Sequence, residues 1–389
     1  MTLQLVPLPP NVWKVLPGRG AIAQGFALAG VPAPWLPFSL APDETIAQVL
    51  SLLPPLAMAL AIFASAEEGR RRSAAVLIAI AVGSVLLGLA QITGGPDSPF
   101  YFYGITNRES AVGFFANRNH LGTLLLAVLP FLAAFAVTSD HDARRRIGRH
   151  MLIGGLALLV LCGLVLDRSR AGLLLAVPIS LGCVAFVLPH PRSRRAAVRA
   201  AAGVACGLVL FAALIAATRG LGGFVPDAGA QHRATIVPTT LRAATDYLPF
   251  GSGGGSFQQI YPSYEDAAAV TPQFINHAHC DYAEFLLEYG APGAILILTA
   301  LALWIGRGRA LAGLGAYRGR LGRAGFVALG AAILHSGVDY PLRTAAIAVV
   351  AAMAAALVTA PEPLVAGEAG RSRTRARPSM RLSAAAADL

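Results

Sequence analysis

Long apolar stretches separated by polar segments recur along the chain from about residue 45 to residue 360. A helix of about 20 apolar residues crosses the hydrocarbon core of a bilayer, which is roughly 30 Å thick. The pattern therefore predicts an all-α, polytopic membrane protein with about nine transmembrane helices. We expect these helices at residues 45–64, 73–92, 120–138, 151–166, 171–188, 200–217, 290–306, 324–337 and 344–360.

Three polar segments flank or interrupt this membrane domain of residues 45–360. Residues 1–44 form a lead segment, and residues 361–389, rich in Arg, Ser, Ala and Pro, are expected to be a disordered tail. The third segment, residues 218–289, is expected to be a large loop that contains short helices. A loop of that length in a compact protein is usually functional, so we expect the chemistry there.

Composition supports a membrane location. Hydrophobic residues make up 56% of the chain and charged residues 13%, and the mean hydropathy is +0.62, whereas charged residues make up about 25% of soluble domains. The net charge of +11 does not indicate nucleic-acid binding, because the arginines are spread between apolar runs and do not form one face. Three of the four cysteines lie inside apolar runs, which excludes a disulfide framework.

The positions of the arginines predict the orientation of the helices. Most of them fall in alternate polar segments, and cytoplasmic loops retain positive charge. The expected cytoplasmic groups are Arg70–Arg72, Arg144–Arg149, Arg192–Arg199, Arg307–Arg323 and Arg371–Arg381. With nine spans, the N-terminus and the loop 218–289 then face the outside. Residues 1–44 contain no cleavable signal peptide, so we expect the chain to be the later part of a longer protein in preference to unaided translocation of this segment.

A short hairpin places two arginines on the predicted outer face. Arg168 and Arg170 follow Asp167 between the fourth and fifth spans. Arginines on the outer side run against the positive-inside bias. A bound anion is one explanation for them, because a guanidinium can hold phosphate oxygens through two hydrogen bonds. The alternative is an interfacial arginine whose charged end reaches the water.

Residues 276–290 end the large loop. If they are helical, a single polar stripe contains His277, Asp281, Glu284 and Glu288, and His279 lies off that stripe at the helix start, pointing elsewhere. An ordinary amphipathic interfacial helix explains most of this pattern, and a metal site at His277 with the carboxylates is a less favoured alternative. The glycine cluster of residues 251–255 lacks the Lys-Ser/Thr of a phosphate-binding loop, so we expect a flexible loop there.

Four motifs occur in an order that resembles one known superfamily. They are GFFANRNHL at residues 113–121, SRAG at 169–172, Arg233 followed by DYLPFGSG at 246–253, and HCDY at 279–282 with EYG at 288–290. Together they resemble the O-antigen ligase and O-antigen polymerase superfamily of polytopic bacterial glycosyltransferases. The resemblance covers roughly residues 36–360.

The resemblance implies an enzyme of the bacterial inner membrane that acts at the periplasmic face. It implies transfer of a glycan from undecaprenyl diphosphate to the hydroxyl of a glycan or lipid acceptor, with no metal or other cofactor, in surface-polysaccharide biosynthesis. The expected catalytic residues are His279, Arg170 and Arg233. The expected substrate-binding residues are Arg118, Asn119, Arg242, His277, Asp281, Glu288 and Arg343. We expect them in an arginine-lined cavity where the loop 218–289 meets spans three to seven, open sideways to lipid.

Two features depart from the superfamily pattern, and several alternatives stay open. Cys280 stands where an asparagine is usual, and the superfamily typically has ten or more spans. The segments 117–120 and 339–343 look more like those of polymerases than those of ligases, but the acceptor, sugar and linkage are not determined. The alternative class is a secondary transporter, which is less favoured because the span interiors are nearly free of charge.

Overall fold

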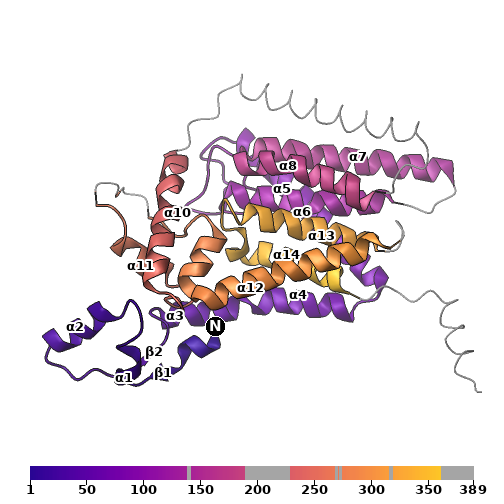
Figure 1. Ribbon diagram of the computed structural model, residues 1–389. Helices are drawn as coiled ribbons and strands as arrows, with labels where there is room; N and C mark the ends of the chain where they lie inside the picture. The colour runs from indigo at the N-terminus through magenta and orange to yellow at the C-terminus, as the bar shows by residue number, and fades with distance from the viewer. Residues whose placement is uncertain (138–141, 189–227, 268–269, 271–273, 315–318, 361–389) are drawn as a thin grey trace, which may run out of the picture.

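The computed structural model describes residues 1–137, 142–188, 228–267, 270, 274–314 and 319–360. Its main body is a helical bundle, beside which the first 41 residues form a small lobe (Figure 1). The bundle helices are α3 (Pro42–Ser51), α4 (Leu53–Ala64), α5 (Glu67–Thr93), α6 (Arg118–Ala136), α7 (Ala143–Leu166), α8 (Arg170–Gly182), η2 (Cys183–Val187), α12 (Asp281–Ala312), α13 (Arg320–His335) and α14 (Ala345–Thr359).

The remaining elements are short or lie in the large loop. The lobe contains η1 (Thr2–Leu5), β1 (Pro7–Leu8), α1 (Pro10–Trp13), α2 (Gly20–Leu28) and β2 (Leu36–Pro37). β1 and β2 pair antiparallel, with Pro7 opposite Pro37. The loop contains α10 (Ala228–Asp246), α11 (Phe257–Ile260) and η3 (Tyr261–Ser263), and η4 (Pro341–Arg343) follows α13. The prediction of helices within this loop is confirmed.

Within the part of the chain that the structure describes, six segments are long and apolar enough to cross a membrane, so the chain is a polytopic membrane protein. They are Pro42–Ala64, Glu67–Thr93, Arg118–Ala136, Ala143–Leu166, Arg170–Val187 and Asp281–Ala312, which correspond to the first five predicted spans and to the seventh. The predicted eighth and ninth spans are the shorter helices α13, of 16 residues, and α14, of 15 residues. The predicted span 200–217 lies outside the described residues.

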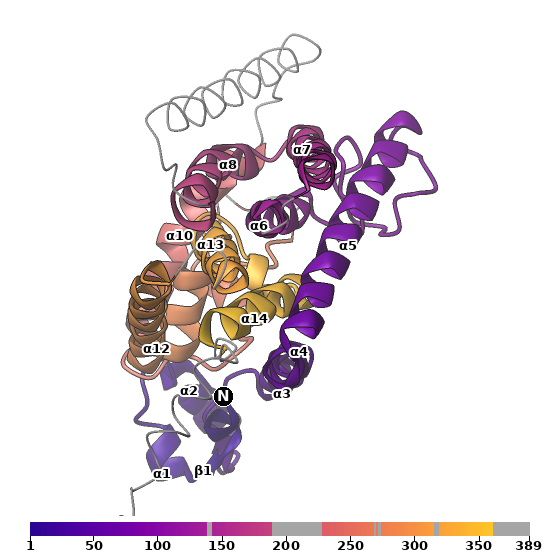
Figure 2. The same ribbon diagram turned by 90° about the vertical axis from the view of Figure 1, so that its right-hand side faces the viewer.

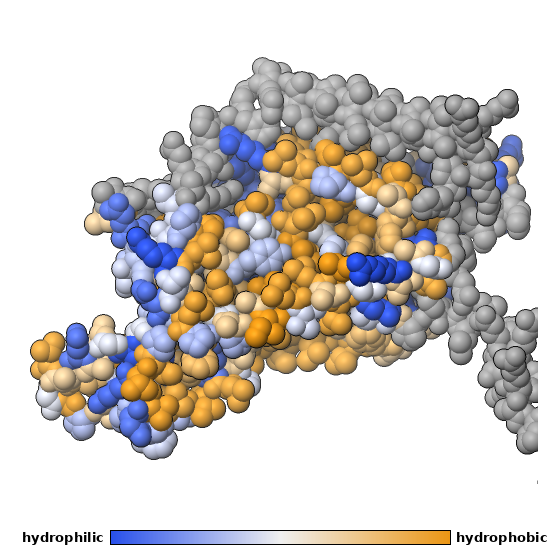
Figure 3. All heavy atoms as spheres, viewed as in Figure 1, coloured by the Kyte–Doolittle hydropathy of each residue, from blue (hydrophilic) through white to orange (hydrophobic). Residues whose placement is uncertain are grey.

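Helix α6 is the core of the bundle. Figure 2 shows it surrounded by α5, α7, α8 and α13, and 83% of its most apolar window is buried. Small residues let neighbouring helices approach closely, as is common in membrane bundles. On α13, a Cβ at Gly325 would lie 2.7 Å from the carbonyl oxygen of Ala354 in α14. Apolar side chains cover the visible flank between the two ends (Figure 3).

The basic segments meet at one end of the bundle. Arg320 Nη2 at the start of α13 lies 3.0 Å from Glu67 Oε1 at the start of α5. At the same end, Arg307 of α12 donates hydrogen bonds to the carbonyl of Val358 in α14. Basic residues in alternate polar segments are expected at the same end of a helical bundle, and these arginines lie there. That this end is cytoplasmic remains a prediction.

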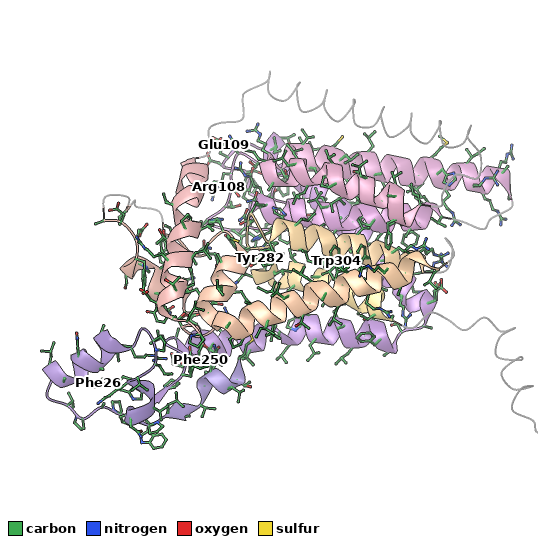
Figure 4. The ribbon with its side chains drawn as sticks, viewed as in Figure 1. Phe26, Arg108, Glu109, Phe250, Tyr282 and Trp304 are labelled. Atoms are coloured by element: carbon green, nitrogen blue, oxygen red, sulfur yellow. The ribbon has the colours of Figure 1, made fainter. Side chains whose placement is uncertain are left out.

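The N-terminal lobe and the large loop meet at the opposite end. Gln4 donates to the carbonyl of Glu288 over 3.1 Å and accepts from the backbone N–H of Gly254 over 3.0 Å. Thr45 at the start of α3 donates to the carbonyl of Gly254 over 2.6 Å. Figure 4 shows Arg108 and Glu109 at this end as well, whereas Trp304 lies farther along α12 than Tyr282. The predicted outer segments therefore share one end, and its periplasmic location stays a prediction.

The glycine cluster is packed, which differs from the predicted flexible loop. The N–H groups of Ser252 and Gly253 donate to the carbonyls of Leu287 and Glu288 over 2.9 and 3.0 Å. Gly253 has a φ of 110°, a conformation that side chains rarely adopt. The loop is packed because glycine has no side chain and so lets two backbone segments approach closely. Its conformational freedom does not make this segment flexible.

Gly290 is the hinge between the site and the membrane part of α12. Its φ of 56° and ψ of −143° interrupt the helix, and a Cβ there would lie 2.2 Å from the carbonyl oxygen of Pro249. We expect Gly290→Ala to lower the free energy of unfolding by about 1–3 kcal/mol, because it adds backbone strain and overpacking. Denaturant titration of the purified protein in detergent measures this change.

Gly306→Ala is the matched control for Gly290→Ala. Gly306 lies in the same helix, and a Cβ there would meet nothing within 4 Å. Since alanine is the better helix former, this substitution should leave stability unchanged or raise it by up to about 1 kcal/mol. Equal stabilities of the two variants would contradict the close approach at Gly290.

Candidate functional site

A histidine and a buried aspartate form a pair where α12 begins and α13 ends. His279 lies one residue before the N-cap residue Cys280 and has a φ of 52°, which turns it away from the helix face that follows. Its Nδ1 lies 3.1 Å from Oδ1 of Asp339. The prediction that His279 sits at the helix start and points elsewhere is thus confirmed.

Asp339 is held as a carboxylate by its neighbours. Its side chain is 1% exposed, Asn119 donates to Oδ2, and the backbone N–H of Tyr340 donates to Oδ1 over 3.0 Å. Burial alone would raise the pKa of Asp339, but chiefly the hydrogen bond with His279 holds it well below its usual value. A carboxylate facing Nδ1 favours the tautomer that carries its proton on Nδ1. Nε2 of His279 is then the ring nitrogen that can accept a proton.

The ring of Tyr340 lies between three histidines. Its centroid is 4.3 Å from that of His277, 5.0 Å from that of His279 and 5.3 Å from that of His120. Burial raises the pKa of the Tyr340 hydroxyl, so this group stays protonated. Asn276 donates to its oxygen over 3.5 Å. Tyr340 therefore packs the histidine rings in place as a neutral group.

The predicted acidic stripe is present, but the helix is shorter than expected. Helix α12 begins at Asp281 and not at residue 276, because the left-handed backbone at His279 ends the preceding turn. His277 still reaches the stripe from the loop, since its Nδ1 lies 2.9 Å from Oε1 of Glu284. The second oxygen of Glu284 accepts from the N–H of Ala278 over 2.8 Å.

Arg343 is surrounded by the carboxylates of this stripe. Its Nη1 and Nη2 donate to the two oxygens of Glu288 over 3.0 and 2.8 Å, and Nη1 lies 3.0 Å from Glu284. Burial alone would lower the pKa of the guanidinium, but Glu288 and Glu284 raise it above its usual value. The guanidinium is therefore fully used within the cluster, in which carboxylates outnumber it.

Asp281 connects α12 to the segment after α13. Its Oδ2 accepts from the hydroxyl of Ser336 over 2.7 Å and from the N–H of Leu342 over 3.2 Å, and Nε of Arg343 lies 3.8 Å from Oδ1. These contacts fix the position of Asp339 relative to His279. No group of three His, Cys, Asp or Glu side chains in the described part of the chain is arranged to hold a metal ion, and the carboxylates near His277 are already paired with Arg343.

A cavity of about 600 Å³ lies beside this cluster. Its lining comes from α3, α4, α12 and α14, from the loop before α12, which contributes His277, and from η4, which contributes Arg343. The contributing membrane helices are the first, seventh and ninth predicted spans, and Arg343 is the one arginine in its lining. The arginine-lined cavity expected beside spans three to seven stays a separate prediction, because the side chain of Arg233 lies outside the described residues.

The other predicted site arginines are distributed over three helices. Arg170 is exposed at the first position of α8, and Arg118 occupies the first position of α6, next to Asn119. Arg242 of α10 donates to the carbonyl of Tyr264 over 2.6 Å. Arg233 also lies in α10, but its side chain is outside the described residues, so its proximity to Arg170 stays a prediction.

The structure thus brings six of the predicted residues into one cluster, which also contains residues that were not predicted as part of the site. The six are Asn119, His277, His279, Asp281, Glu288 and Arg343. Asp339 and Tyr340 were missed as site residues, and Glu284 was recognised only as part of the stripe. One signal was present in the sequence: Asp339 directly follows the predicted eighth span, on the same predicted face as His279.

Comparison with known families supports the resemblance over part of the chain. Residues 155–298 match the family model described as O-antigen ligase. The matched segment begins within α7 and ends within α12, and it contains His279 and the acidic stripe, whereas Asp339 and Arg343 follow it. No curated protein matches the chain.

Proposed function

We propose that the protein is a membrane glycosyltransferase of the O-antigen ligase and polymerase type. In this proposal it transfers or polymerises an oligosaccharide from undecaprenyl diphosphate onto an acceptor hydroxyl, at the periplasmic face of the inner membrane, in surface-polysaccharide synthesis. The family match over residues 155–298 supports the class of activity. The observation that carries the mechanism is the pairing of His279 with the buried Asp339.

The proposed transfer step follows from this pairing. Nε2 of His279 takes the proton of the acceptor hydroxyl while the hydroxyl oxygen attacks the anomeric carbon of the donor. The bond between that carbon and the diphosphate oxygen breaks, and undecaprenyl diphosphate leaves with the electron pair. Asp339 stabilises the imidazolium that forms, because its negative charge lies beside Nδ1.

Arginines are proposed to stabilise the leaving group. Negative charge grows on the diphosphate as the bond breaks, and guanidinium groups fixed in advance favour that charge without a metal. Arg170 and Arg233 are assigned this role, with Arg118 and Asn119 beside the donor. We expect a chelator to leave transfer by purified membranes unchanged. Loss of activity on chelation, with recovery on addition of a divalent cation, would contradict the metal-independent step.

Arginine-to-lysine substitutions separate charge from geometry. Arg170→Lys and Arg233→Lys each keep a positive charge but lose the planar fork that binds two oxygens. We expect each to lower transfer by about 10²-fold, the loss typical of one misplaced charge-stabilising group. The rate is measured as glycan formation by membranes supplied with the lipid-linked donor.

Arg145→Lys is the matched control. Arg145 is exposed on α7, at the basic end of the bundle, 3.6 Å from Asp142, and should retain the wild-type rate. Wild-type rates in both Arg170→Lys and Arg233→Lys would remove the two arginines from the mechanism.

A further inference from the structure

The cavity beside Arg343 divides into an apolar part and a polar part. Leu52, at the junction of α3 and α4, and Pro55 of α4 form one wall, and α12 contributes Leu296, Ile297 and Ala300 to the other. Helix α14 contributes Ala345 and Ala348 and lies against α4. In Figure 2, α14 lies between α4 and α12. This part of the cavity is a groove with apolar walls.

The apolar groove suits a hydrocarbon chain. Leu52 and Leu296 are 48% and 61% exposed, so the walls continue onto the lipid-facing flank of the bundle. Each buried methylene group of a chain in such a groove contributes about 0.8 kcal/mol. A ligand that stays anchored in the bilayer can therefore enter from the side.

The polar part contains neutral hydrogen-bonding groups and aromatic rings. Gln258 and Asn276 contribute amides from the large loop, and Gln48 contributes one from α3. Phe257 and Phe285 also line the cavity. Apolar and aromatic walls with a few placed polar groups are the usual composition of a small-molecule site. Hydroxyl-rich ligands can both donate to and accept from such amides.

The charge of the lining disfavours an anionic ligand. The lining contains the carboxylates of Glu44, Asp281 and Glu284 against one arginine and Met1, the terminal residue with its amino group, and the arginine is already paired with Glu284 and Glu288. A phosphate or diphosphate placed there would meet unfavourable charge and no free guanidinium in this lining. The diphosphate of the donor therefore belongs elsewhere.

His277 forms a second histidine–carboxylate pair, on the cavity side. Its Nδ1 is used by Glu284, so Nε2 is the ring atom that remains for a ligand. The ring of Tyr340 contacts both His277 and His279, at 4.3 and 5.0 Å between centroids. A group bound at the polar part of the cavity is thus close to the proposed base.

From this geometry we infer that the cavity binds an uncharged saccharide attached to a hydrocarbon chain, and that this glycolipid is the acceptor. The chain lies in the groove between α4 and α12, and the saccharide contacts His277 and the amides. His277 is a positioning residue that accepts a hydrogen bond from a saccharide hydroxyl. The acceptor assignment rests on the proposed transfer activity, whereas the binding preference can be tested without it.

The binding test uses the full chain in nanodiscs of uncharged lipid and a photoreactive alkyl glucoside as probe. We expect saturable labelling of peptides from α4 or α12, and octyl glucoside should compete at least about tenfold better than octyl phosphate, a difference of about 1.4 kcal/mol. Glu44→Lys, at an exposed lining position, should improve competition by octyl phosphate. Equal or better competition by octyl phosphate against the wild-type protein would overturn the inference.

A pair of tryptophan substitutions on α12 tests the groove. Ala300→Trp fills it and should weaken labelling at least about tenfold, the loss expected when a bulky side chain replaces several methylene contacts. Leu298→Trp is the matched control, because Leu298 is 66% exposed on the same helix and does not line the cavity. Wild-type labelling in Ala300→Trp would also overturn the inference.

Transfer assays separate the two proposals. If the cavity holds the acceptor, Ala300→Trp raises the KM for the acceptor and leaves kcat within about twofold, as loss of uniform binding does. An unchanged acceptor KM in an otherwise active Ala300→Trp protein would refute the acceptor site alone. Glucoside labelling without any transfer from lipid-linked donors would refute the proposed glycosyltransferase and leave the binding site in place.

Discussion

Replacing His279 by alanine is expected to lower glycosyl transfer by about 10²- to 10⁴-fold, the usual contribution of a general base. The substitution removes the ring whose Nδ1 faces Asp339 over 3.1 Å, and with it the nitrogen that accepts the acceptor proton. Donor binding should be retained, because the arginines assigned to the diphosphate are unchanged. The measurements are the rate of glycan formation by membranes and, separately, retention of the lipid-linked donor by purified protein.

His150→Ala is the matched control for this substitution. His150 is exposed on α7, and its ring contacts the carbonyl of Ala136 over 3.2 Å, at the basic end of the bundle. It should show the wild-type rate. Full activity in His279→Ala would end the assignment of His279 as the base.

Asp339→Asn, like His279→Ala, should lower the rate of glycan formation. An amide in place of the carboxylate no longer fixes the proton on Nδ1 of His279 or stabilises the imidazolium.

The membrane helices could be predicted because the signal for a span is local. A run of apolar residues identifies a span regardless of what it packs against, and six such runs appear as long helices. Helix α13 is harder to place from the sequence, since the apolar run covers only residues 324–337. The structure starts this helix at Arg320 and buries Arg320 and Arg323. Burial of charged residues depends on their partners, such as Glu67 for Arg320.

The candidate site could be predicted only in part, because its pairs are distant in sequence. His279 and Asp339 are separated by 60 positions, and Gln48 and Tyr289, which share a hydrogen bond of 2.6 Å, are separated by 241 positions. No periodicity relates such residues. The acidic stripe could be read from the helical repeat, but its partner Arg343 depends on how the segment after α13 folds back.

The cavity beside Arg343 was not predictable from the order of the spans. The arginine-lined cavity expected where the loop 218–289 meets spans three to seven stays a separate prediction. The cavity beside Arg343 lies between α4 and α12, whereas α6 packs among α5, α7, α8 and α13 (Figure 2). Which helix becomes the core is a property of packing and not of the hydropathy of each run.

Arg343→Leu is expected to destabilise the protein by about 3–5 kcal/mol, the typical cost of removing one partner from a buried ion pair. Glu284 and Glu288 are 1% and 0% exposed and would lose the guanidinium that both contact. Glu288→Gln in the same chain should restore part of the loss, because it removes one unpaired charge. Arg309→Leu, at an exposed position near the other end of α12, is the matched control and should stay within about 0.5 kcal/mol of wild type. Denaturant titration of detergent-purified proteins measures all three variants. If Arg343→Leu proved as stable as Arg309→Leu, the carboxylates around Arg343 could not depend on its charge, and the ion-paired cluster beside the cavity would have to be abandoned.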